Sequence, residues 1–83
     1  MALGKSLMKV LSKPYPPMSG MELRFGRYDL YVKTDNEGNA VVLFIGQRQE
    51  NGSIKGERYA RRLKKDDAGN VIKDHWELKG KAT

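Results

Sequence analysis

The sequence contains no cysteine and only one histidine, His75. Without cysteine the chain can form neither disulfides nor thiolate metal sites, and one histidine is too few for a typical zinc site. A small domain without disulfides is typical of a reducing compartment, so a cytoplasmic location is predicted. We also expect no bound metal and no other cofactor.

Long apolar segments are lacking as well. The run Val41–Ile45 is far shorter than the roughly 20 apolar residues that a membrane-spanning helix needs. Lysines interrupt the N-terminal residues, whereas a signal peptide requires about 7–15 consecutive apolar residues. The sequence therefore predicts neither membrane association nor secretion through a signal peptide.

Residue patterns typical of catalysis are absent. The serines lie in the N-terminal arm or in a turn, and none has a histidine near it in the sequence. Asp74 and His75 are neighbours on a predicted strand, so their side chains point to opposite faces. The glycines do not have the spacing of a phosphate-binding loop. We expect a non-enzymatic protein with no small-molecule substrate.

Residues 1–20 differ from the rest of the chain. Leu3, Leu7, Met8 and Leu11 would share one side of a short helix, which the Pro-rich segment 13–17 would end. The prediction is an N-terminal arm or linker, either disordered or packed on the remainder. For the Pro-rich segment, a linker or strap is favoured over a ligand for an SH3-type domain. Residues 21–83 would form the folded domain.

The folded domain is predicted to be mainly β, a four-stranded antiparallel meander. Three Gly- and Asn-containing turn signals separate strands at roughly 24–34, 40–50, 53–65 and 71–80. Residues 27–41 and 58–72, which are 31 positions apart, are identical at six of fifteen positions. The domain therefore resembles one hairpin written twice, and the two copies would be joined by a two-residue turn at Asn51–Gly52.

The register expected from these turns puts Leu30 opposite Phe44, Tyr59 beside Phe44 and Ala60 opposite Trp76. Both faces of the sheet would then be apolar, which a lone sheet in water cannot sustain. Three solutions are open: the sheet curls into a half-barrel, the N-terminal arm covers one face, or two copies pack together.

The third predicted strand carries the strongest functional signal. The protein has a net charge of +6, while residues 55–65 alone sum to +5. Clustered cations with interleaved aromatic residues are typical of single-strand nucleic-acid binders. The predicted function is weakly sequence-specific nucleic-acid binding. The candidate binding residues are Lys55, Arg58, Tyr59, Arg61, Arg62, Lys64 and Trp76.

Several alternatives to this function remain open. Tyr59 and Trp76 could be core residues, and Arg62 could pair with Asp74 across two strands. Lysine and arginine also protect exposed strands against aggregation. An 83-residue chain has little core of its own, so a protein-interaction module or a small homodimer is the alternative function.

Overall fold

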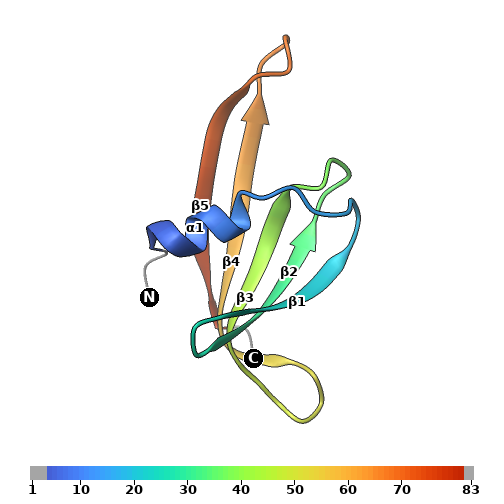
Figure 1. Cartoon of the computed structure of the whole chain (residues 1–83). Helices are drawn as coiled ribbons and strands as arrows, with labels where there is room; N and C mark the ends of the chain where they lie inside the picture. Colours follow the sequence, from blue (N-terminus) through green and yellow to red (C-terminus); the bar gives the residue numbers. More distant parts are fainter. Residues whose placement is uncertain (1–3, 82–83) are drawn as a thin grey trace.

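The computed structural model describes residues 4–81 of the chain, which form one helix and five strands (Figure 1). The elements are α1 (Lys5–Leu11), β1 (Gly20–Phe25), β2 (Tyr28–Thr34), β3 (Ala40–Arg48), β4 (Ile54–Lys65) and β5 (Val71–Lys81). The strands form one open antiparallel sheet in the order β1-β2-β3-β4-β5. The predicted mainly-β meander is confirmed, but the predicted number of four strands is wrong.

The additional strand comes from a turn that sequence reasoning did not find. Residues 24–34 were expected to form one strand, but Gly26 and Arg27 connect β1 to β2, and Phe25 pairs with Tyr28. Gly26 has φ +60° while Arg27 has no positive φ. This combination is typical of a type II′ hairpin turn, which takes glycine at its first central position.

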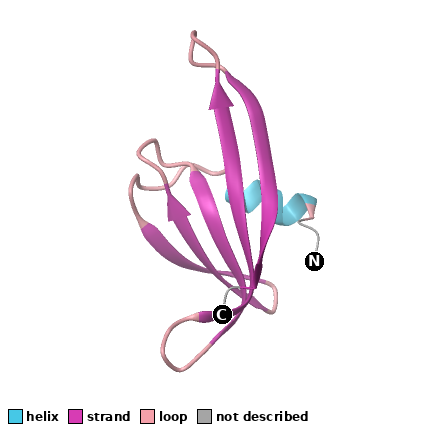
Figure 2. Ribbon diagram, turned by 180° about the vertical axis from the view of Figure 1, so that it is seen from behind, coloured by secondary structure: helices cyan, strands magenta, loops and turns pink. Residues whose placement is uncertain are grey.

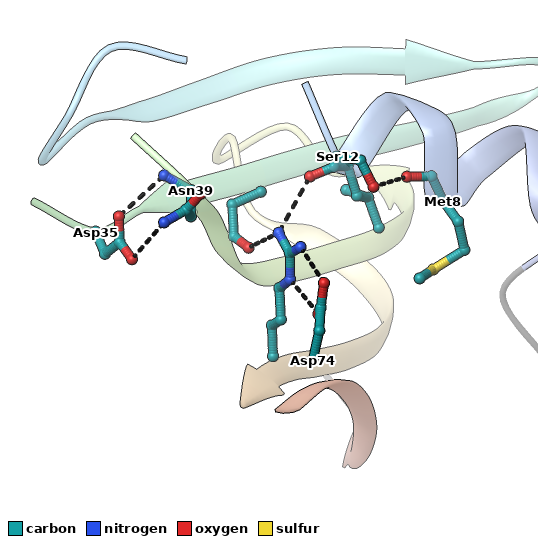
Figure 3. Close-up of polar contacts among 8 residues, drawn as sticks. Met8, Ser12, Asp35, Asn39 and Asp74 are labelled. Carbon is teal, nitrogen blue, oxygen red and sulfur yellow. Dashed lines mark hydrogen bonds and ion pairs between the residues drawn. The ribbon is translucent and has the colours of Figure 1, made fainter. Parts of the chain in front are cut away.

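The turns after β2 and β4 have the same hydrogen bonds, so the 31-residue repeat is also a structural repeat. Asp35 Oδ1 accepts two backbone amides of its turn, each at 2.9 Å, and Asp66 Oδ1 accepts the equivalent pair at 3.0 and 2.9 Å. Gly38 and Gly69 follow with φ of 83° and 86°. Glycine adopts this left-handed conformation at little cost. Figure 3 shows the contact between Asp35 and Asn39.

A bulge follows each of these turns and corrects the expected register. Val41 is skipped in the pairing of β2 with β3, and its repeat counterpart Ile72 is skipped in the pairing of β4 with β5. A skipped residue moves all later pairs by one position. Leu30 therefore lies opposite Ile45, and the expected pair with Phe44 is wrong.

The turn between β3 and β4 is longer than expected. The N–H of Gln49 donates to the carbonyl of Ser53 at 2.7 Å, so three residues separate the closing pair. Gly52 has φ 88°, whereas Asn51 has no positive φ, which rules out the expected two-residue type I′ turn. The pairing of β3 with β4 is therefore also shifted by one residue from the expected register.

The corrected register separates the side chains into an apolar face and a mixed face. Tyr59 lies opposite Leu43, not beside Phe44, and Arg61, not Ala60, lies opposite Trp76. The apolar side chains thus gather on one side of the sheet. The buried core consists of Leu7, Leu11, Leu30, Val32, Ala40, Leu43, Ile45 and Tyr59.

Helix α1 covers the apolar face. Leu7 and Leu11 are 3% and 0% exposed and belong to the core cluster. Figures 1 and 2 show α1 crossing β4 and β5 on one side of the sheet. Of the three solutions for the apolar surface, the structure therefore shows the arm on the sheet. Leu3, which was expected on the same side of this helix, lies outside the described residues.

The Pro-rich segment is a strap that holds α1 to the turn between β2 and β3. Tyr15 donates its hydroxyl to the carbonyl of Val10 at 2.6 Å and its backbone N–H to the carbonyl of Gly38 at 3.1 Å. Thr34 is 8% exposed, and its hydroxyl donates to the carbonyl of Pro16 at 2.7 Å. These bonds satisfy backbone groups that proline-containing segments cannot pair in a helix or sheet.

Candidate nucleic-acid interface

The side of the sheet opposite α1 carries the candidate site, and we call it the open face. Strand side chains alternate between the two faces, so the neighbours of the core residues point to this side. On the three central strands the open-face side chains are those of Asp29, Tyr31, Lys33, Val42, Phe44, Arg48, Ile54, Arg58, Ala60, Arg62 and Lys64, and on β5 they are those of Lys73, His75 and Glu77.

An aromatic pair lies near the middle of the open face. Tyr31 and Phe44 are cross-strand partners whose ring centroids are 6.2 Å apart, with the planes tilted by 43°. Both residues are half-buried. The Tyr31 hydroxyl lies over Gly20 of β1, where any side chain would collide with it. The absence of a side chain at Gly20 therefore leaves room for the Tyr31 ring to lie over β1.

Cations lie beside the Phe44 ring of this pair. The Lys33 ammonium lies 6.0 Å from the centroid of the Phe44 ring, within the range of a cation–π contact. Arg58 lies directly opposite Phe44 on β4 and is exposed. The arrangement places positive charge on two sides of the Phe44 ring.

The open face continues onto β5, where positive charge outweighs negative charge. Arg62 reaches Glu77 at 3.3 Å, and its side chain remains 61% exposed. Lys64 lies directly opposite Lys73, and like charges in that position destabilise a sheet. A shallow groove at this end is lined by Arg61, Arg62, Leu63, Lys64 and Lys73. A bound anion would relieve the repulsion between the two lysines.

Glu77 is the acidic centre of this region. Its carboxylate accepts a hydrogen bond from the Lys79 ammonium at 2.9 Å and lies 3.9 Å from the imidazole of His75. The hydrogen bond from Lys79 lowers the pKa of Glu77, and the charge of Arg62 lowers it further. Glu77 thus remains ionised and partly balances the cations near it.

The two aromatic residues named from the sequence lie on the other face. Tyr59 is 4% exposed and belongs to the core, and burial, with a smaller effect of Glu57, raises the pKa of its phenol. Trp76 packs against the same core, and the Arg61 guanidinium lies 5.8 Å from the centroid of its ring. Neither ring is on the face that carries Arg58.

Arg61 also serves the fold on the covered face. Its guanidinium donates to both carboxylate oxygens of Asp74, at 2.7 and 2.6 Å, and to the carbonyls of Ala40 and Leu11 at 3.3 and 3.5 Å (Figure 3). Its side chain is only 9% exposed. The predicted pairing of Asp74 with Arg62 is wrong, because Arg62 lies opposite His75.

The predicted cations therefore fall into separate groups. Arg58, Arg62 and Lys64 lie together on the open face, and all three are exposed. Lys55 is exposed near the start of β4, opposite Gln47 and away from the other three. The structure thus brings together three of the cations named from the sequence.

Three open-face residues, Tyr31, Lys33 and Phe44, were missed as site residues. The alternation of Tyr31 and Lys33 with Leu30 and Val32 already put them on a common face. The expected register, however, placed Phe44 with Leu30 on the opposite face. Only the bulge at Val41 brings Phe44 beside Tyr31.

Comparison with known proteins finds no matching family, no matching curated protein and no matching solved structure. Within residues 4–81 no helix is long and apolar enough to cross a membrane. The same residues contain no group of three or more histidine, aspartate or glutamate side chains that could hold a metal ion.

Proposed function

We propose that the protein binds single-stranded nucleic acid on the open face, with little sequence specificity. The observation that carries this proposal is the Tyr31–Phe44 pair with Lys33 and Arg58 beside it, on the side of the sheet opposite α1. Single-strand binders combine aromatic rings that stack on bases with cations that follow the backbone.

The aromatic pair suits base stacking because its rings are already held in place. The Tyr31 ring contacts Phe44 on the neighbouring strand, and its hydroxyl lies over Gly20. The ring is therefore already ordered, so little side-chain entropy is lost when a base stacks on it. Stacking on an aromatic side chain contributes about 1–3 kcal/mol per base and tolerates any base. Stacking on the flat faces of these rings does not distinguish one base from another, so it selects little sequence.

The cations on β4 form a row along the same face. Alternate strand residues lie about 6.7 Å apart, so Arg58, Arg62 and Lys64 extend over several nucleotides of a stretched strand. The Arg62–Glu77 ion pair is a surface contact worth about 0–1 kcal/mol. Arg62 can therefore exchange the carboxylate for a phosphate at small cost.

The test is a fluorescence-anisotropy titration with single- and double-stranded oligonucleotides at several salt concentrations. We expect tighter binding to the single strand, with a log–log salt slope of about −2 to −3 from three or four phosphate contacts. The variant Arg58→Ala/Arg62→Ala/Lys64→Ala removes the row on β4. It should lose about tenfold or more in affinity at low salt.

A matched control removes the same charge from the covered side. Lys5, Lys9 and Lys13 are exposed residues of α1 and the segment after it. Their triple alanine variant should lose less than about threefold, because their charges act only at long range. Undetectable binding of the unmodified protein at low salt, or equal losses in the two triple variants, would overturn the proposal.

A further inference from the structure

Strand β5 has an unusual amount of exposed apolar surface for an edge strand. Val71, Ile72 and Leu78 are 53%, 59% and 52% exposed, and within residues 4–81 the only other exposed large apolar side chain is that of Met18. β5 is bonded to β4 alone in the sheet, so its outer edge has backbone groups free for another strand. Exposed apolar residues on an unpaired edge indicate a pairing site.

The bulges of β5 limit where another strand can pair. Ile72 and Lys79 are the two residues that the pairing with β4 skips. Bulges twist an edge strand and interrupt its ladder, so they discourage pairing beyond them. Between them, residues 73–78 pair with β4 residue by residue. An added strand would therefore align with this regular segment.

We infer that the occupant of this edge is β5 of a second copy, paired antiparallel across a two-fold axis at His75. A symmetric antiparallel pair must place one residue opposite itself, because opposite residues share a face. With His75 at the centre, Lys73 lies opposite Glu77 twice, and each of these pairs joins opposite charges. The exposed Leu78 lies at each end of the regular segment, next to the bulged Ile72 of the other copy.

The two neighbouring symmetric registers are disfavoured by charge. A two-fold axis at Asp74 would put this carboxylate opposite its own copy. An axis at Trp76 would put Lys73 opposite Lys79 twice. Like charges directly opposite each other destabilise a sheet. The His75 register places no lysine opposite a lysine and no carboxylate opposite a carboxylate within the regular segment.

The dimer would enlarge the open face that is proposed to bind nucleic acid. The inference of a dimer does not depend on nucleic-acid binding. A two-fold axis perpendicular to the sheet keeps the open faces of both copies on the same side, with Lys73 and His75 of each copy at the centre. The proposed interface could nevertheless bind a single strand as a monomer, so either proposal can fail alone.

Disulfide trapping tests this register directly, because the chain has no cysteine of its own. Opposite residues in an antiparallel pair have Cα atoms about 4.5–5.5 Å apart, within the range that a disulfide bridges. His75→Cys should therefore form a covalent dimer under mild oxidation at micromolar concentration. Lys73→Cys should not, because its two copies would be about 14 Å apart in this register.

A mixture of two variants provides a second readout. Lys73→Cys and Glu77→Cys proteins mixed together should form the covalent heterodimer, and each alone should remain uncrosslinked. Sedimentation of the unmodified protein should show a concentration-dependent dimer. A strict monomer up to several hundred micromolar, or crosslinking of Lys73→Cys as efficient as that of His75→Cys, would overturn the inference.

Discussion

Arg61 and Asp74 form a two-point ion pair on the covered face of the sheet, with nitrogen–oxygen distances of 2.7 and 2.6 Å. Two parallel hydrogen bonds of this kind are the strongest contact that arginine makes with a carboxylate. The same guanidinium donates to the carbonyl of Leu11 at the end of α1. One side chain of the basic strand thus connects β5, β4 and the helix.

Removing Arg61 should destabilise the protein. In Arg61→Ala the carboxylate of Asp74 loses both donors, and the carbonyls of Leu11 and Ala40 lose a polar contact. We expect a decrease of about 1–3 kcal/mol in the free energy of unfolding, measured by urea denaturation. Arg62→Ala is the matched control and should change it by less than about 0.5 kcal/mol. Equal effects of the two variants would refute the structural role of Arg61.

The ion pair should also make the stability depend on pH. Hydrogen bonds from Arg61 lower the pKa of Asp74 below its usual 3.8, against a smaller opposing effect of burial. The unfolded chain therefore binds this proton at higher pH than the folded chain does. The contribution is present above about pH 4 and is lost as the pH falls through the lower folded value.

Urea titrations of Asp74→Asn between pH 7 and pH 2 measure this dependence. The variant should be less stable than the unmodified protein at neutral pH, and the difference should shrink in acid. The stability of Asp74→Asn should still fall in acid, because the pKa values of Asp35 and Glu77 are also lowered in the folded protein. A constant difference across the whole range would contradict the assignment.

The structural repeat offers a comparison of two glycines with the same backbone conformation. Gly38 and Gly69 have φ of 83° and 86°, so alanine at either should cost about 1 kcal/mol of stability. A Cβ at Gly69 meets open space, whereas a Cβ at Gly38 would collide with the carbonyl oxygen of Tyr15. Thermal unfolding should show Gly38→Ala to be the more destabilising variant. The opposite order would contradict the position of the strap.

Phe44 and Trp76 should separate binding from stability. Phe44→Ala removes a half-buried ring of the open face, so affinity for a single-stranded oligonucleotide should fall about 5- to 100-fold at one salt concentration. Trp76→Ala removes a ring that packs on the core, so it should lower the urea midpoint more than Phe44→Ala does. If the folded fraction of Trp76→Ala binds the oligonucleotide as weakly as Phe44→Ala does, base stacking on the open face is excluded.

The sequence predicted the elements of the fold better than their register. The turn residues Asp35–Asn39 and Asp66–Asn70 are local signals, and they located both repeated hairpins correctly. The bulges at Val41 and Ile72 were not predicted, because a skipped residue depends on how two strands meet. The turn at Gly26 was overlooked, although glycine at the first position of a two-residue loop is a recognisable signal.

The same shift in register explains the mixed result for the candidate site. The density of charge on β4 was visible in the sequence, but the face that each cation occupies was not. Arg61 and Tyr59 share the covered face, where one completes an ion pair and the other the core. Phe44 was assigned to the wrong side of the sheet for the same reason.

The most direct test of the central proposal is an NMR titration of the labelled protein with a short single-stranded oligonucleotide. We expect the largest chemical-shift changes at Tyr31, Lys33, Phe44, Arg58 and Arg62, with the indole N–H of Trp76 nearly unchanged. Changes that saturate with the oligonucleotide and map to this face would support the proposal. Changes concentrated on α1 and Trp76, or none at low salt, would contradict it.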